Sequence, residues 1–323
     1  MAEHLLIQLA LLAVGLYLLW GGAELLVKYS VQVASSFGIS PLIIGLTVVS
    51  IGTSLPELFV STVAAIENEI GISIGNILGS NIANLGLILG LGALIYPLPV
   101  QKTWLRREVP FMILVTLVFV GCAITGFQIG WAEGVLLLLL FALFVGYILR
   151  YSLREMAEFE ELQKAHSDAK SQSPRVIHWL LIAVGIAILV GGSKLTVFAA
   201  VRLAEKLDVN NTIIGLTLIA LGTSLPELAT TLVSAAKKEV DLAIGNIIGS
   251  NIFNLVLVGG ITAFIRPVQM DQTMLLFLEL PILVFITLIV WPIMRTDWRI
   301  IRGEGFSLLL VYILFITFSA GIL

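Results

Sequence analysis

The sequence predicts an all-α polytopic membrane protein with about ten transmembrane helices, arranged as two inverted-topology five-helix repeats. Of its 323 residues, 59% are hydrophobic and only 12% are charged, and the mean hydropathy is +1.06. A soluble domain would carry about 25% charged residues. Apolar segments recur along the whole length, and the segment 45–90 returns at 215–260 without a gap, with roughly half of its positions identical.

The predicted spans are apolar segments close to the ~20 residues that a transmembrane helix needs. The first is expected to be retained, because residues 1–4 lack the Lys or Arg of a signal peptide. A charged segment divides the spans into five and five, which gives a first repeat over 1–150, a cytoplasmic linker over 151–175 and a second repeat over 176–323. The expected spans are 5–28, 41–65, 72–95, 108–127, 132–150, 178–200, 211–235, 242–265, 274–294 and 304–322.

The odd number of spans in each half inserts the second half upside down relative to the first, so a pseudo-twofold axis in the membrane plane relates them. Most Lys and Arg residues fall in one set of loops, whereas the opposite set holds only Arg202, Lys206 and Arg266. Positively charged loops remain in the cytoplasm. We therefore expect a multi-pass protein of the cell or inner membrane with both termini outside.

Each repeat carries one carboxylate inside an apolar run, Glu57 in GTSLPE and Glu227 in the second GTSLPE. An ionisable side chain at this depth is costly and by default marks a functional site. The prolines, Pro56 and Pro226, remove a backbone donor and free carbonyl oxygens about one turn earlier. The kink thus gathers carbonyl, hydroxyl and carboxylate oxygens, which suit hard cations such as Ca²⁺ or Na⁺.

A second motif follows in each repeat, GNILGSNIAN in the first and GNIIGSNIFN in the second. Ser80 and Asn84 are four residues apart, hence on one helix face, as are Ser250 and Asn254. Inverting the halves would bring both clusters together near the midplane, without a basic partner from these motifs. Two carboxylates balance one Ca²⁺, and the same site could hold Na⁺ or protons instead, which is the charge logic of an exchanger.

Other polar and charged residues give weaker evidence of a functional site. Asn76, Asn81, Asn246 and Asn251 are as consistent with helix cross-linking as with ion binding. Glu24 and Lys28 are four residues apart and are expected to pair with each other. The single cysteine, Cys122, permits no intramolecular disulfide, and the sequence contains no phosphate loop or dinucleotide fingerprint.

At the two repeated motifs the sequence resembles the calcium/cation antiporter superfamily, specifically the short prokaryotic sodium/calcium exchangers, whose alpha-repeats carry GTSLPE followed by GNxxGSNIxN. The resemblance covers essentially the whole chain. It implies Ca²⁺ extrusion driven by Na⁺ influx, with the first and sixth spans sliding across a fixed core. It also implies Na⁺ ligands from the backbone oxygens of Ser50 and Ala220. The side chains that it implies for the ion sites are those of Thr53, Ser54, Glu57, Ser80, Asn84, Thr223, Ser224, Glu227, Ser250 and Asn254.

The leading expectation is a secondary antiporter that exchanges Na⁺ for Ca²⁺ by alternating access at a midplane site. Its expected partners are these ions and the lipid bilayer, with no cofactor, nucleic acid or obligate protein partner. An H⁺/Ca²⁺ antiporter is the first alternative. A K⁺-dependent exchanger is less favoured, because relatives of that kind can have Asp where this chain has Asn254. A cation channel ranks lower, and an intramembrane enzyme lowest, because the motifs pair no His, Cys or Asp with Ser54 or Ser224.

Overall fold

The computed structural model describes residues 2–165, 176–206, 220–269 and 275–319, whose regular secondary structure is helical apart from four two-residue strands. Within these ranges, eight helices are long and apolar enough to cross a membrane, and one bent pair would add a ninth span. The predicted span 211–235 is described only from residue 220 onwards, so its first part lies outside the described residues. The predicted all-helical, multi-pass fold is confirmed.

In the first half, several predicted spans consist of more than one helical segment. The second span is bent by 43° between Thr53 and Leu55, and π-helical turns (η1 and η2) interrupt the second and third spans. The elements are α1 (Ala2–Phe37), α2 (Pro41–Ile44), η1 (Gly45–Val49), α3 (Ser50–Thr53), α4 (Leu55–Ile66), α5 (Ile70–Ala83), η2 (Asn84–Ile88), α6 (Leu89–Ile95), β1 (Leu98–Pro99), α7 (Lys102–Arg106), α8 (Glu108–Thr125), β2 (Gln128–Ile129) and α9 (Trp131–Ala165).

The second half follows a similar order where it is described. Its elements are α10 (Val176–Lys206), α12 (Ala220–Thr223), α13 (Leu225–Ala236), α14 (Val240–Phe253), η4 (Asn254–Val258), α15 (Gly259–Ile265), β3 (Val268–Gln269), η5 (Leu275–Glu279), α16 (Leu280–Arg295), η6 (Thr296–Trp298), β4 (Arg299–Ile300) and α17 (Arg302–Ser319). The order differs in that η5 precedes α16 where α7 precedes α8, and in that η6 precedes β4. Helix α9 continues to Ala165, into the segment that the sequence assigns to the linker. Residues 166–175 of that segment lie outside the description.

Short strands connect the two halves at symmetry-related positions. Strand β1 pairs antiparallel with β4, aligning Leu98 with Ile300, and β2 pairs antiparallel with β3, aligning Ile129 with Val268. Each pair contains one strand from each half. The halves are therefore joined by backbone hydrogen bonds as well as by side-chain packing.

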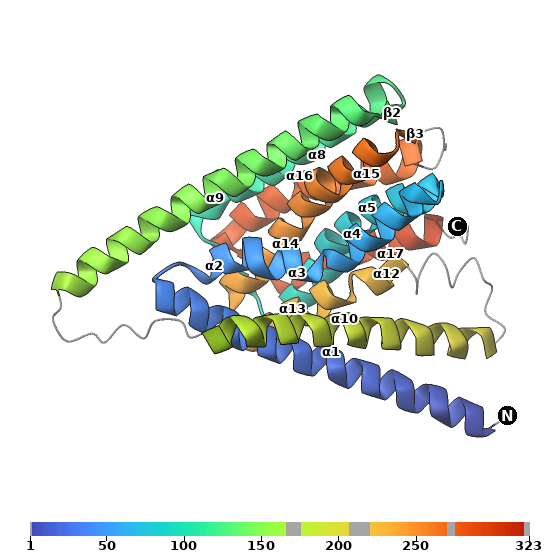
Figure 1. The fold of residues 1–323 in the computed structure, drawn as a ribbon, viewed down its shortest axis with the longest axis horizontal. Helices are drawn as coiled ribbons and strands as arrows, with labels where there is room; N and C mark the ends of the chain where they lie inside the picture. Colours follow the sequence, from blue (N-terminus) through green and yellow to red (C-terminus); the bar gives the residue numbers. More distant parts are fainter. Residues whose placement is uncertain (1, 166–175, 207–219, 270–274, 320–323) are drawn as a thin grey trace.

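Helices α1 and α10 lie side by side along one edge of the molecule, and α8 and α9 lie at the opposite edge (Figure 1). Glycines bring the backbones of α1 and α10 into contact, because a Cβ at Gly22 would lie 2.9 Å from the carbonyl oxygen of Gly185 and one at Gly185 would lie 3.0 Å from that of Gly22. Small residues permit such close approach between membrane helices. The two helices thus form one closely packed pair.

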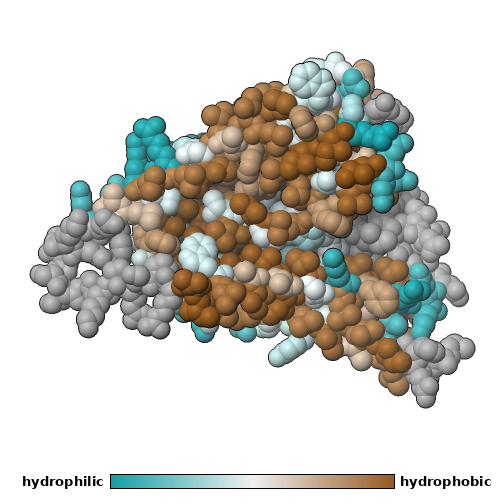
Figure 2. Space-filling view, viewed as in Figure 1, coloured by the Kyte–Doolittle hydropathy of each residue, from teal (hydrophilic) through white to brown (hydrophobic). Residues whose placement is uncertain are grey.

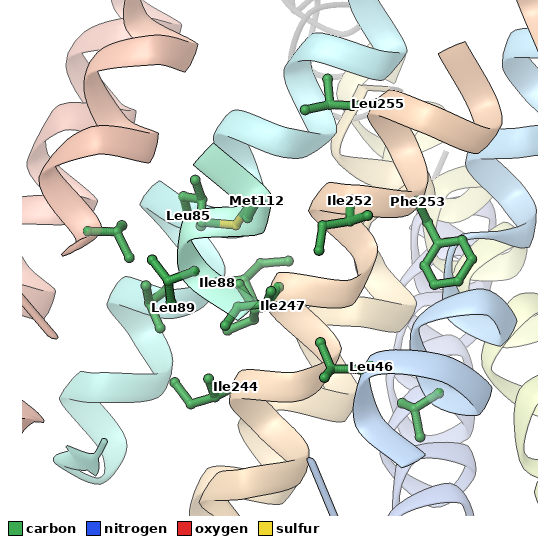
Figure 3. Close-up of a cluster of buried hydrophobic side chains, with 14 of the residues drawn as sticks. Leu46, Leu85, Ile88, Leu89, Met112, Ile244, Ile247, Ile252, Phe253 and Leu255 are labelled. Carbon is green, nitrogen blue, oxygen red and sulfur yellow. The ribbon is translucent and has the colours of Figure 1, made fainter. Parts of the chain in front are cut away.

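The core between these edges is apolar and is formed by both halves. Figure 3 shows Leu46 from η1 and Ile88 from η2 beside Ile244 and Ile247 from α14. All four side chains are at most 1% exposed. In Figure 2 hydrophobic side chains cover the middle of the visible face, and hydrophilic ones gather towards its ends, as expected for a surface in contact with lipid.

Candidate ion-binding site

The central site is built around two helix breaks at equivalent positions. Ser54 separates α3 from α4, and Ser224 separates α12 from α13. Both residues have a backbone conformation outside the helical region, with φ of −83° and −87° and ψ of 5°. Pro56 and Pro226 are the second residues of the helices that follow, where a missing N–H is tolerated. The kink predicted from the Gly-Thr-Ser-Leu-Pro string is confirmed in the first half by the 43° bend.

Both carboxylates are completely buried, and each accepts a hydrogen bond from the other half of the protein. Ser54 Oγ donates to Glu227 Oε1 at 2.9 Å, and Ser224 Oγ donates to Glu57 Oε1 at 3.0 Å. Ser250 Oγ adds a longer contact of 3.5 Å to Glu227 Oε1. Each Ser therefore donates to the Glu of the other half, a crossed arrangement that the motif within one half does not predict.

Asn76 and Asn246 also connect the two halves. Thr223 Oγ1 donates to Asn76 Oδ1 at 3.0 Å, and Thr53 Oγ1 donates to Asn246 Oδ1 at 3.2 Å. The amide of Asn76 donates in turn to the Glu57 carbonyl oxygen at 3.2 Å. The structure thus supports the cross-linking role for these two residues. Asn81 and Asn251 instead donate to carbonyl oxygens of their own helices, four residues earlier.

The second motif contributes one further polar contact between the halves. Asn254 Nδ2 donates to Ser80 Oγ at 3.1 Å, again between the halves. Asn84 and Asn254 are fully buried, and each is the first residue of a π-helical turn. Such turns occur often at functional sites. Of the four predicted residues, Ser250 contacts a carboxylate and Asn254 contacts Ser80, whereas Asn84 has no hydrogen-bond partner among the described residues. Their role in ion binding stays a prediction.

Several buried oxygens at the site accept no hydrogen bond from the residues that the structure describes. They are Oε2 of Glu57, Oε2 of Glu227, and Oδ1 of Asn84 and Asn254. Of the two ion pairs found in the described ranges, neither includes Glu57 or Glu227. A buried carboxylate is stable as an anion only when a cation or sufficient hydrogen bonds compensate it. These four unpartnered oxygens match the preference of hard cations for oxygen ligands.

The expected backbone ligands are less clearly placed. The Ser50 carbonyl oxygen already accepts hydrogen bonds from Ser54 N at 3.0 Å and Thr53 Oγ1 at 3.4 Å. Ala220 is the first described residue of α12, and its surroundings are not described. Ion binding by Ser50 and Ala220 therefore stays a prediction.

Two contacts differ from the sequence-based expectations. Glu24 does not pair with Lys28; its Oε1 lies 2.7 Å from Lys237 Nζ at the end of α13. The expected pairing was wrong because tertiary packing brings α13 against this face of α1. The Gly222 carbonyl oxygen, four residues before Pro226, accepts a hydrogen bond from Ser193 Oγ. Ser193 was not predicted from the sequence. The difference between Ser193 and Ala23, which occupies the equivalent position of the first half, could have indicated it.

A cavity of about 510 Å³ adjoins the site at Thr223, although neither carboxylate is part of its lining. It lies between α4 and α10, and its lining includes Leu55, Phe59, Lys194 and Thr223. Thr223 is only partly buried, whereas Thr53 at the equivalent position is 1% exposed. The equivalent surfaces of α13 and α1 pack against each other. The site is thus approached on the α4 side and closed on the α13 side.

Removing either bridging hydroxyl should weaken the binding of Ca²⁺, the cation expected from the sequence. In Ser54→Ala the Glu227 carboxylate loses its closest donor and the site loses one oxygen, so we expect apparent Ca²⁺ affinity to fall about tenfold or more, since hydrogen bonds to charged groups are worth ~1.5–3 kcal/mol. Ser224→Ala should behave alike, because the contacts are symmetric. Concentration-dependent Ca²⁺ uptake measures this. Thr116→Val is the control, because this buried hydroxyl bonds only the Met112 carbonyl oxygen of its own helix. Unchanged affinity in both Ser variants would contradict the assignment.

The fold and site define a class: a membrane transporter of two homologous inverted halves with a buried, oxygen-lined site between them. The sodium/calcium exchanger protein family model matches residues 7–150 and 177–321. The chain belongs to this family.

Individual relatives agree over nearly the whole length. The chain is 41% identical to the inner membrane protein YrbG of Escherichia coli, over 83% of this chain and 82% of that protein. It is 33% identical to the sodium/calcium exchanger MaX1 of Methanosarcina acetivorans, over 96% and 97%. Among solved structures, the sodium-calcium exchanger NCX_Mj soaked with Na⁺ and Sr²⁺ superposes with a TM-score of 0.81 at 31% identity, covering 98% of both chains.

Proposed function

We propose that this protein exchanges Na⁺ for Ca²⁺ by alternating access at the site between Glu57 and Glu227. The observation that carries the proposal is the crossed pair of hydrogen bonds, in which each half holds the other half's buried carboxylate through a serine hydroxyl. Two carboxylates compensate one Ca²⁺, or more than one Na⁺, but not both loads at once. Mutually exclusive occupancy couples the two ions.

The comparisons support these cations. The solved relative is named a sodium-calcium exchanger and was soaked with Na⁺ and Sr²⁺, and MaX1 is named a sodium/calcium exchanger. The agreement in fold and chain coverage supports proposing the same cations for this chain. We place the protein in the inner membrane, as the printed name of YrbG suggests. The distribution of Lys and Arg supports an orientation with both termini outside.

The decisive experiment is uptake of radioactive Ca²⁺ into proteoliposomes loaded with Na⁺ and diluted into Na⁺-free buffer. We expect uptake that requires internal Na⁺, because the outward Na⁺ gradient drives Ca²⁺ inward. Vesicles loaded with K⁺ and vesicles with only a pH gradient are the controls. Uptake driven by a pH gradient alone would replace Na⁺ by H⁺ as the coupling ion. Uptake without any counter-ion would indicate a channel.

A further inference from the structure

The ion pair between Glu24 and Lys237 has a charge-reversed counterpart in the other half. The repeat offset of 170 residues relates Glu24 to Lys194 and Glu67 to Lys237. The same helix pair of the other half, α10 and α4, therefore carries a Lys where α1 carries a Glu, and a Glu where α13 carries a Lys. Each of the two helix pairs thus contains one acidic and one basic residue at these positions, but the acidic and basic residues are swapped between the equivalent positions.

Only one of the two equivalent pairs is formed in the structure. Glu24 and Lys237 are in contact at 2.7 Å, on the side where α1 packs against α13. Lys194 and Glu67 are both described and both exposed, and they form no ion pair. Lys194 Nζ instead lies 6.0 Å from the ring centroid of Phe59, in the lining of the cavity between α4 and α10. The pair is made on the closed side and absent on the open side.

The geometry gives the direction in which the second pair would form. Phe59 lies eight residues before Glu67, which corresponds to ~12 Å along a helix. A shift of α10 along α4 by up to this distance, towards Glu67, would bring Lys194 to the end of α4. Because α1 and α10 are held together at Gly22 and Gly185, α1 would move with α10. Helix α1 runs antiparallel to α10, and α13 ends at the opposite end of the core from the end of α4 (Figure 1). The same shift therefore separates Glu24 from Lys237, which follows the end of α13.

We propose that the two pairs are alternating latches: Glu24–Lys237 holds the state seen here, and Lys194–Glu67 holds the state in which the cavity is closed and the opposite side is open. This inference rests on the proposed alternating-access function, in which inverted halves exchange conformations. Each state contains one Glu–Lys pair at equivalent positions. The latches therefore balance one another, and neither state is favoured by them alone.

Neutralising one charge should shift the balance in a direction set by the latch to which it belongs. We use Val197→Cys, in the cavity lining, as a reporter in a protein whose native Cys122 is replaced by Ser, and measure its labelling by a membrane-impermeant thiol reagent. Lys237→Gln should slow labelling and Glu67→Gln should accelerate it. Exposed ion pairs are weak, so the shift should be about two- to fivefold. Glu205→Gln, which breaks the exposed pair with Arg202 on α10, is the control and should leave the rate unchanged.

Paired cysteines supply a second test. Glu24→Cys with Lys237→Cys, and separately Lys194→Cys with Glu67→Cys, should each be cross-linked by a bis-methanethiosulfonate reagent whose spacer matches the reach of a Glu and a Lys side chain, because a direct disulfide needs Cα atoms within about 7 Å. The cross-link should stop transport until a reductant is added. Failure of the Lys194–Glu67 positions to cross-link, or equal shifts of labelling in the same direction for Lys237→Gln and Glu67→Gln, would overturn the latches. Labelling does not require Na⁺ or Ca²⁺ to be the transported ions. A wrong assignment of the transported ions would therefore appear in the ion-flux measurements, whereas wrong latches would appear in the labelling and cross-linking measurements.

Discussion

Replacing Glu57 or Glu227 by Gln is expected to abolish Ca²⁺ uptake while leaving folded protein in the membrane. Gln has nearly the same size and keeps an oxygen that can accept the hydrogen bond from the opposite serine. The substitution removes one of the two charges that, in the proposed exchange, compensate Ca²⁺ in a fully buried site. Because the contacts of the two carboxylates are related by the repeat, the two single variants should lose comparable activity. Radioactive Ca²⁺ uptake into Na⁺-loaded proteoliposomes measures the loss.

Glu304→Gln is the matched control for these variants. Glu304 accepts a hydrogen bond from Ile301 N at the start of α17, far along the chain from either break. Its neutralisation should leave uptake close to that of the unmodified protein. Gel filtration before reconstitution separates lost transport from lost folding. Near-normal uptake by either Glu57→Gln or Glu227→Gln would contradict the central site.

Replacing Gly245 by a larger residue should strongly lower the thermal stability of the protein. A Cβ at this position would lie 2.6 Å from the Leu42 carbonyl oxygen and 3.1 Å from Gly45 Cα, so the obstacle is backbone of the other half. Overpacking of a core commonly costs ~1–3 kcal/mol, and neighbouring backbone yields less readily than side chains. We expect Gly245→Ala to lower the thermal midpoint and Gly245→Val to prevent recovery of folded protein.

The fraction of protein that remains monodisperse after heating in detergent measures this effect. Gly146→Ala on α9 is the control, because a Cβ there would meet no atom of the described chain within 4 Å. That variant should be as stable as the unmodified protein or slightly more so, since Ala favours helix more than Gly does. An unchanged thermal midpoint in Gly245→Ala would show that the halves tolerate separation at this contact.

The repeat carries most of what the sequence can predict. A buried Glu after a Gly-Thr-Ser-Leu-Pro string predicts a broken helix with oxygens collected at the break, and the bend at Ser54 confirms the break. The membrane requirement for internally paired backbone makes such a break interpretable from one sequence. The inverted arrangement follows from an odd number of spans in each half.

Two aspects of the site depend on tertiary geometry and could not be predicted. The crossing of partners, with Ser54 on Glu227 and Ser224 on Glu57, requires the relative placement of the halves, which no periodicity within a half contains. The π-helical turns at Asn84 and Asn254 use the same residue types as ordinary helix. The mispredicted Glu24–Lys28 pair shows the same limit, because spacing along one helix competes with contacts from another.

The exchanged charges on α1 and α10 also determine how the membrane potential acts on the protein. If the helix pair moves as one unit, Glu24 and Lys194 travel through the field together, with equal and opposite charge. A single elementary charge moved fully across a 100 mV potential would change the free energy by ~2.3 kcal/mol, whereas this pair contributes no net term. With Glu at both positions, voltage would hold the unloaded protein in one orientation. With one Glu and one Lys, these positions leave the potential to act on the transported ions.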